Sequence, residues 1–270
     1  MGAGLLASFF HLGRPERAWR TATMWRTSWL AREVIVLPAF MASVALYGAL
    51  HLFSPAALPA PGSAFAVDAS LAAGVLGTLL AFALFACTGM IYACLRFLAE
   101  WHTPLTLVNF TLLGMASGFT LATGLAAVST PQHVGFLAAW AVVLTVLGAA
   151  ARLMSLRRNA RLKPLSTVQS AIGVKHPAIA QKSQGFMGSS FNTREFFHRA
   201  STQRLRLVKH GFVWLAFVAP PLLLLGGRNQ ASIALLLAAF AVQYAGLLAE
   251  RWFFFAQARH PQNLYYQAVS

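Results

Sequence analysis

Six long apolar stretches constrain this chain more than any other feature of its sequence. A helix needs roughly 20 apolar residues to cross the hydrocarbon core of a bilayer, which is about 30 Å thick. A backbone inside lipid must also satisfy its own hydrogen bonds, and a helix does so within one segment. The sequence therefore predicts an all-α, polytopic bundle of transmembrane helices. The six full spans are expected at about 33–53, 70–95, 105–128, 133–153, 211–227 and 231–256.

The composition of the chain agrees with a membrane protein. Of its 270 residues 58% are hydrophobic and only 10% are charged, whereas about a quarter of the residues of a soluble domain are charged. A net charge of +15 would suggest nucleic acid in a soluble protein. In a membrane protein, basic residues collect in cytoplasmic loops and at lipid head groups. We therefore expect a lipid membrane as a partner, and no nucleic acid.

The N-terminal apolar segment is too short to be a span of its own. Residues 1–12 would reach only about 18 Å as a helix. They also differ from a signal peptide, because no basic region precedes the apolar part and no small-residue cleavage site follows it. We expect a partial span, the tail of a longer helix. Residues 1–270 are then a single integral membrane domain with six full spans and one partial span.

Lysine and arginine divide very unequally between the two sides of this predicted bundle. When the loops are placed alternately on two sides, one side receives twenty of these residues and the other receives Arg228 alone. Because basic residues mark the cytoplasmic side, the sequence predicts a multi-pass protein of the bacterial inner membrane with its basic loops in the cytoplasm.

Twelve of the basic residues lie between Arg152 and Lys209, in the one long connection of the chain. This loop, at about 154–210, contains amphipathic pieces. One interpretation is an interfacial segment held by anionic lipid, and the other is a docking surface for a soluble partner. The sequence leaves both open.

The basic loop that follows the partial span carries the candidate site. His11 and Glu33 flank this loop, and Trp19 and Trp29 lie within it. Oxidation of a quinol releases two protons with two electrons, so its site needs a hydrogen-bonding base beside an apolar pocket that admits a ring. The alternative is structural: the tryptophans form an ordinary aromatic belt, His11 caps a helix, and Glu33 pairs with Arg32 at a helix N-terminus.

Other ionisable residues suggest no further chemistry. Glu100 lies in a short turn and is expected to be solvated, and Glu250 is expected to pair with Arg251 at the interface. The eight histidines fall at span ends or in loops, which argues against haem between facing helices. Cys87 and Cys94 have no metal-ligand spacing, so we expect no iron–sulfur cluster in this chain.

Four segments of the sequence are distinctive when taken together. They are FHLGRPERAW (10–19), SWLARE (28–33), WHTPLT (101–106) and AERWFFFAQARHPQNLYY (249–266). With the order of the spans, these segments resemble the membrane anchor subunit of the dimethyl sulfoxide reductase family. The resemblance covers nearly the whole chain.

The resemblance implies an eight-helix, haem-free anchor that oxidises menaquinol or ubiquinol in anaerobic respiration. The electrons would pass to a four-cluster ferredoxin-like iron–sulfur subunit and then to a molybdopterin catalytic subunit, so the anchor has no terminal reductase activity by itself. On this pattern His11 and Glu33 match the histidine and the carboxylate of the quinol site, and Trp19 and Trp29 are expected to wall it.

Two departures from the family pattern stand out. The first helix and much of the second are missing, which suggests a fragment or a misplaced start codon, and the long basic loop is an elaboration.

Two other functions stay open. The chain could be a tether that recruits soluble subunits without binding quinol, or a transporter, although it shows little of the repeat symmetry and few of the broken helices that transporters usually have.

Overall fold

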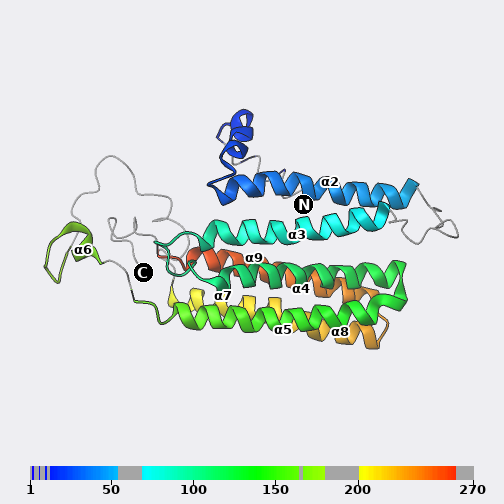
Figure 1. The fold of residues 1–270 in the computed structure, drawn as a ribbon. Coiled ribbons are helices and arrows are strands. Elements are labelled where there is room, and N and C mark those ends of the chain that lie inside the picture. The colour runs from blue at the N-terminus through cyan, green and yellow to red at the C-terminus, as the bar shows by residue number, and fades with distance from the viewer. Residues whose placement is uncertain are drawn as a thin grey trace. The chain divides into compact units, whose positions relative to one another are not determined.

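The computed structural model describes residues 13–53, 69–163, 167–179 and 201–259, together with positions 2, 6 and 10. Within these residues the fold is all-α, as predicted (Figure 1). Two short 3-10 helices are present, and a π-helical turn interrupts one long helix. The elements are η1 (Pro15–Met24), α2 (Trp29–Phe53), α3 (Ala69–Ala93), α4 (Pro104–Ser129), η2 (Pro131–His133), α5 (Val134–Asn159), α6 (Val168–Ile172), α7 (Thr202–Val213), η4 (Trp214–Val218), α8 (Ala219–Asn229) and α9 (Ile233–Ala256).

Six of the described helical segments are long and apolar enough to cross a membrane, which confirms the predicted number of full spans. Their bounds are Trp29–Phe53, Ala69–Ala93, Pro104–Ser129, Pro131–Asn159, Gln203–Asn229 and Ile233–Ala256. The largest differences flank the long loop, where the fourth span extends to Asn159 and the fifth begins at Gln203. A span predicted from hydropathy ends where the first arginines appear. The observed helix continues beyond them, because its backbone hydrogen bonds do not depend on the polarity of the side chains.

The chain divides into two compact units, Met1–Tyr92 and Ala93–Ser270. In the N-terminal unit α2 and α3 run side by side (Figure 1). Small residues permit this approach, since a Cβ atom added at Gly74 would lie 3.2 Å from Cε2 of Tyr47. A Cβ atom at Gly77 would lie 3.4 Å from Oγ of Ser43. Small residues thus keep α3 slim where α2 packs against it.

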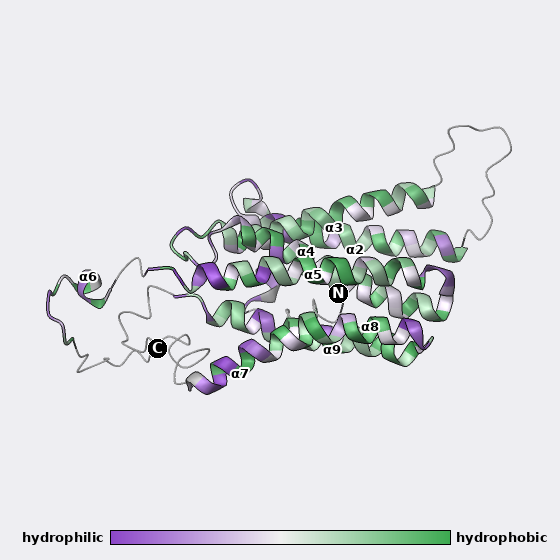
Figure 2. Ribbon diagram, turned by 90° about the horizontal axis from the view of Figure 1, so that it is seen from below, coloured by the Kyte–Doolittle hydropathy of each residue, from purple (hydrophilic) through white to green (hydrophobic). Residues whose placement is uncertain are grey.

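The C-terminal unit is a bundle in which α4 packs against α5 and α9, and α8 packs against α9. Apolar residues predominate along these helices, and hydrophilic residues gather at the end of α5 and the start of α7 (Figure 2). One buried cluster joins α4, α5, α7, η4 and α9, and a second cluster lies along α5, α8 and α9. The first contains Leu113, Leu156, Phe212, Ala216, Phe217 and Phe253, and the second contains Ala141, Leu224, Leu236 and Ala239.

A widened turn in the fifth span is explained by the prolines that follow it. Pro220 has no N–H group, so it cannot bond the carbonyl of Ala216, four residues earlier. Gln243 of α9 supplies a replacement donor, with Nε2 lying 3.4 Å from that carbonyl oxygen. Gly246 lets the two backbones meet, because a Cβ atom there would lie 2.4 Å from the nitrogen of Ala216. The π-helical turn is thus satisfied by a neighbouring helix, as lipid requires.

Candidate functional site

The predicted site lies in the N-terminal unit, and the structure describes part of it. His11 lies outside the described residues, so its role stays a prediction. Glu33 and Trp29 are half-buried in the first turns of α2, while Trp19 belongs to η1.

Glu33 is tied to the neighbouring helix rather than to a basic residue. The hydroxyl Oγ1 of Thr88, near the end of α3, donates a hydrogen bond to Oε1 of Glu33. Thr88 follows Cys87, a buried residue that is 6% exposed. Sequence reasoning did not single out Thr88, since a threonine in an apolar run normally bonds its own helix. A carboxylate at one end of a two-helix contact is thus held by a neutral donor.

Arg32, next to Glu33 in sequence, is engaged elsewhere. Its Nε donates to the carbonyl of Trp25 and its Nη2 to the carbonyl of Arg26, each at 2.9 Å. The guanidinium carbon also lies 4.1 Å from the centre of the Trp29 ring. Among the described residues no ion pair joins Arg32 to Glu33, so the alternative in which these two pair is wrong. Arg32 instead caps the loop that leads into α2.

The two predicted tryptophans have different environments. Trp29 is half-buried beneath the Arg32 guanidinium. Trp19 is 65% exposed, and Arg20 lies over its ring at 5.7 Å. An exposed, cation-capped tryptophan is also what an aromatic belt at a membrane interface presents. The structure therefore brings Trp29 and Arg32 together and leaves Trp19 on the surface.

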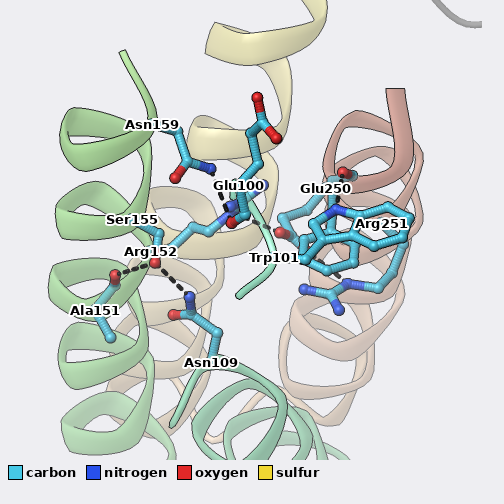
Figure 3. A network of polar contacts seen from close by, with 10 residues as sticks. Glu100, Trp101, Asn109, Ala151, Arg152, Ser155, Asn159, Glu250 and Arg251 are labelled. Atoms are coloured by element: carbon cyan, nitrogen blue, oxygen red, sulfur yellow. Dashed lines mark hydrogen bonds and ion pairs between the residues drawn. The ribbon is translucent and has the colours of Figure 1, made fainter. Parts of the chain in front are cut away.

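A second polar cluster, in the C-terminal unit, joins α5 to α9 (Figure 3). Oε1 of Glu250 lies 2.6 Å from Nε of Arg152, and Oε2 lies 2.6 Å from Nε of Arg251. The side chain of Glu250 is 0% exposed and that of Arg152 is 2% exposed. The predicted pair of Glu250 with Arg251 is confirmed, but it lies inside the bundle. Arg152, which the sequence assigned to the start of the long loop, is its unexpected third member.

Aromatic rings surround the two arginines. The guanidinium of Arg152 lies 5.9 Å from the ring centres of Phe212 and Phe254. That of Arg251 lies 4.2 Å from the ring centre of Phe110 and 4.8 Å from that of Phe254. Ring faces attract cations, so the positive charge that Glu250 leaves uncompensated is stabilised by these contacts.

The turn between α3 and α4 is fixed to the end of α5. Nη1 of Arg158 donates to the carbonyl of Ala99 at 2.9 Å. Nδ2 of Asn159 donates to the carbonyl of Glu100 at 3.4 Å (Figure 3). Glu100 is only 9% exposed, so the expectation of a solvated carboxylate was wrong. Hydropathy alone carries no signal for this burial.

The WHTPLT segment forms the second half of this turn and starts α4. Thr103 caps the helix by accepting a hydrogen bond from the N–H of Leu105, and Pro104 occupies the first turn. The hydroxyl of Thr106 donates to the carbonyl of Trp101 at 2.7 Å. The Trp101 ring in turn stacks on Phe254 at 5.2 Å. Thr103, Pro104 and Thr106 are therefore explained by the start of α4, and Trp101 by its packing on α9.

Polar contacts continue along the interface between α4 and α5. Nδ2 of Asn109 donates to Oγ of Ser155 at 2.8 Å, and that hydroxyl donates to the carbonyl of Ala151 at 3.1 Å (Figure 3). Such chains satisfy polar groups that lipid cannot. Within the described ranges, no group of three or more His, Cys, Asp or Glu residues could hold a metal ion.

Comparison with known proteins decides the family. A family model described as the DMSO reductase anchor subunit (DmsC) matches residues 1–266. The chain belongs to the DMSO reductase anchor subunit family. One relative of the anchor is a subunit of the sulfite dehydrogenase of Allochromatium vinosum, which is 58% identical over 274 residues, covering 99% of this chain and 83% of that protein. No solved structure matches the chain.

Membership confirms the resemblance seen in the sequence and makes this chain the membrane anchor of a DMSO reductase-family complex. Anchors of this family are haem-free and bind quinol. An anchor also implies catalytic and iron–sulfur partner subunits as well as a membrane. With six candidate spans, it is a multi-pass membrane protein.

Proposed function

We propose that this chain anchors a sulfite dehydrogenase-like complex and exchanges electrons between the iron–sulfur subunit of that complex and membrane quinone. The observation that carries the proposal is 58% identity over 99% of the chain to a sulfite dehydrogenase subunit. The iron–sulfur subunit is the four-cluster ferredoxin-like protein that the family pattern implies, and molybdopterin is held by the catalytic subunit.

The direction of electron flow then reverses the prediction from sequence, which had quinol oxidised. A dehydrogenase removes electrons from its substrate: sulfite and water give sulfate, two protons and two electrons. Quinone takes up two electrons and two protons and becomes quinol. In either direction the site must exchange protons with the quinone oxygens, so the same kinds of side chain serve both.

We assign this proton exchange to His11 and Glu33, and the wall of the ring pocket to Trp29 and Trp19. Support for Glu33 comes from its position, half-buried at the start of α2 and bound to a neutral hydroxyl rather than to a cation. Arg32 is bound to backbone carbonyls and leaves this carboxylate to Thr88. A carboxylate within hydrogen-bonding reach of a quinone oxygen can exchange a proton with it.

We also propose that the basic loops face the cytoplasm of a bacterial cell and that the whole chain acts as one anchor domain. The charge asymmetry supports the orientation. Removing buried Arg152 from the basic loops lowers their count from twenty to nineteen, against one on the other side. Labelling of single cysteines placed at exposed Arg157 and at Arg228 in intact cells tests this orientation. Preferential labelling of the Arg157 site from outside would reverse it.

Activity measurements on membranes that contain the intact complex test the function. Sulfite should reduce both an artificial dye and a water-soluble quinone analogue in the wild type. In His11→Ala, sulfite-dependent quinone reduction should be abolished while sulfite-dependent dye reduction persists. Equal loss of both activities would remove His11 from the quinone site, and the absence of any sulfite-dependent activity would remove the sulfite assignment.

A second candidate is quinol oxidation that feeds a reductase, and the description of the family favours it. The same membranes distinguish the two functions when reduced quinol and dimethyl sulfoxide replace quinone and sulfite. A complex that reduces dye with sulfite, but neither reduces quinone nor binds a quinone-site inhibitor, would instead identify the chain as a tether.

A further inference from the structure

We propose that Thr88 is a positioning residue for proton exchange with quinone: it holds Glu33 in place from the neighbouring helix. The inference rests on the proposed function, because it assigns a role to Thr88 through Glu33. Its structural basis is the hydrogen bond from Oγ1 of Thr88 to Oε1 of Glu33, across 55 residues of sequence.

The contact belongs to the general packing of α2 on α3. The side chain of Ser43 packs next to Gly77, and that of Tyr47 packs next to Gly74, along the same pair of helices. In an antiparallel pair of helices, the numbers of two facing residues have a nearly constant sum. That sum is 120 or 121 for these two pairs and for Glu33 with Thr88, so all three belong to one register. Glu33 and Tyr47 are fourteen residues apart, as are Gly74 and Thr88, so each pair lies two heptads apart along one stripe. The helix pairing itself therefore brings Thr88 to Glu33.

Thr88 uses its hydroxyl differently from five other threonines of the described helices. A helical threonine commonly donates to the carbonyl four residues earlier in its own helix. Thr88 instead donates across the interface to a carboxylate. The threonines that do follow the usual pattern are Thr78, Thr111, Thr120, Thr123 and Thr145.

The chemistry of the two groups explains why this bond would matter to the reaction. A hydroxyl has one proton to donate, so the bond fixes Oε1 and restricts rotation of the Glu33 carboxylate. Oε2 makes no hydrogen bond to any residue in the described part of the chain, and it is the oxygen we assign to the quinone. On quinone reduction Oε2–H would give its proton to a quinone oxygen, leaving a carboxylate that regains a proton from the aqueous side.

A purely structural role for Thr88, as a link between α2 and α3, makes a different prediction. Loss of such a link would lower the amount of assembled complex and reduce quinone-dependent and dye-dependent activity together. Loss of a positioning contact would lower quinone turnover alone, since the partner subunits perform the dye reaction. It would also act mainly on kcat rather than on KM, because the contact orients a proton donor and not the quinone ring.

The test compares Thr88→Val, which keeps the shape and removes the hydroxyl, with Thr88→Ser, which keeps the hydroxyl. In membranes with the intact complex, Thr88→Val should lower kcat for sulfite-dependent reduction of a quinone analogue roughly tenfold, as expected for the loss of one hydrogen bond. Thr88→Ser should restore most of the rate. The matched control is Thr78→Val on the same helix, whose hydroxyl bonds only its own helix, and it should leave the rate unchanged.

Either of two results would overturn the inference: a wild-type rate in Thr88→Val, or equal loss of quinone-dependent and dye-dependent activity. If Thr88→Val does not assemble, Thr88→Cys, with a weaker donor, should give an intermediate quinone rate at full dye activity, and a wild-type rate would overturn the inference.

Glu33→Gln distinguishes a failure of this inference from a failure of the proposed function. Wild-type quinone activity in Glu33→Gln would remove Glu33, and with it Thr88, from the site. Loss in Glu33→Gln together with a wild-type rate in Thr88→Val would overturn only the role of Thr88. If Thr88 acts through Glu33, the double variant should be no slower than Glu33→Gln alone.

Discussion

Arg152 and Glu250 meet inside the C-terminal helix bundle, with Nε of the arginine 2.6 Å from Oε1 of the carboxylate. The two residues are 98 positions apart and belong to α5 and α9. Both are excluded from solvent, so each would be costly to bury alone. The pair therefore fixes α5 against α9 near the end of the bundle that carries the long loop.

Breaking this pair should destabilise the bundle strongly. Glu250→Gln leaves the guanidinium groups of Arg152 and Arg251 without a counter-charge, which costs about 3–5 kcal/mol for a buried pair. We expect a large drop in the thermal unfolding temperature of the detergent-solubilised complex and in its yield. Glu16→Gln is the matched control, because Glu16 and Arg17 are 65% and 52% exposed and 3.9 Å apart. Equal stability of the two variants would contradict the structural role of the buried pair.

Gly246 should not tolerate a side chain. A Cβ atom there would lie 2.4 Å from the nitrogen of Ala216 and 2.6 Å from the carbonyl carbon of Leu215, both backbone atoms of the π-helical turn. Gly246→Ala should therefore destabilise the unit by about 1–3 kcal/mol, the usual cost of overpacking. Gly118→Ala, where no atom lies within 4 Å of the added Cβ, should be neutral or slightly stabilising. Thermal unfolding of both variants measures the contrast.

Arg158 should hold the turn between α3 and α4. Its Nη1 reaches the carbonyl of Ala99 and its Nη2 the carbonyl of His102, at 2.9 and 3.5 Å. In Arg158→Ala we expect faster hydrogen exchange of the amides of residues 98–102, since the braces on the turn are lost. Arg157→Ala removes an exposed neighbour and should leave exchange unchanged. Equal protection in both variants would show that Arg158 does not brace the turn.

Trp29 should matter more than Trp19 for binding of quinone. Trp29 is half-buried under Arg32, whereas Trp19 is 65% exposed. Trp29→Leu removes a ring from the proposed pocket wall and should raise KM for a quinone analogue several-fold, corresponding to about 1 kcal/mol of lost contact. Trp19→Leu should change KM less. A larger effect at Trp19 would place the ring pocket on the η1 side of the loop.

The spans and the local motifs could be predicted from the sequence because their signals are local. The length of each apolar run predicts a helix, and the Thr-Pro pair of WHTPLT predicts a helix start. The pair of Glu250 and Arg251 was predictable for the same reason, as the two are adjacent. Arg152 was misplaced because hydropathy treats an arginine as the end of a span. Its buried partner lies on another helix, which no local pattern reveals.

The sequence by itself determined that this chain is a multi-span helix bundle and which family its motifs resemble, and it predicts that the basic residues lie on one side of the membrane. These properties depend on composition and spacing along one segment at a time. Only the tertiary structure decided which residues hold the carboxylates. Glu33 is bound by Thr88 rather than by Arg32, and Glu250 is shared by Arg152 and Arg251. The physical reason is that a partner for a half-buried or buried charge is selected by helix packing, which brings together residues distant in sequence.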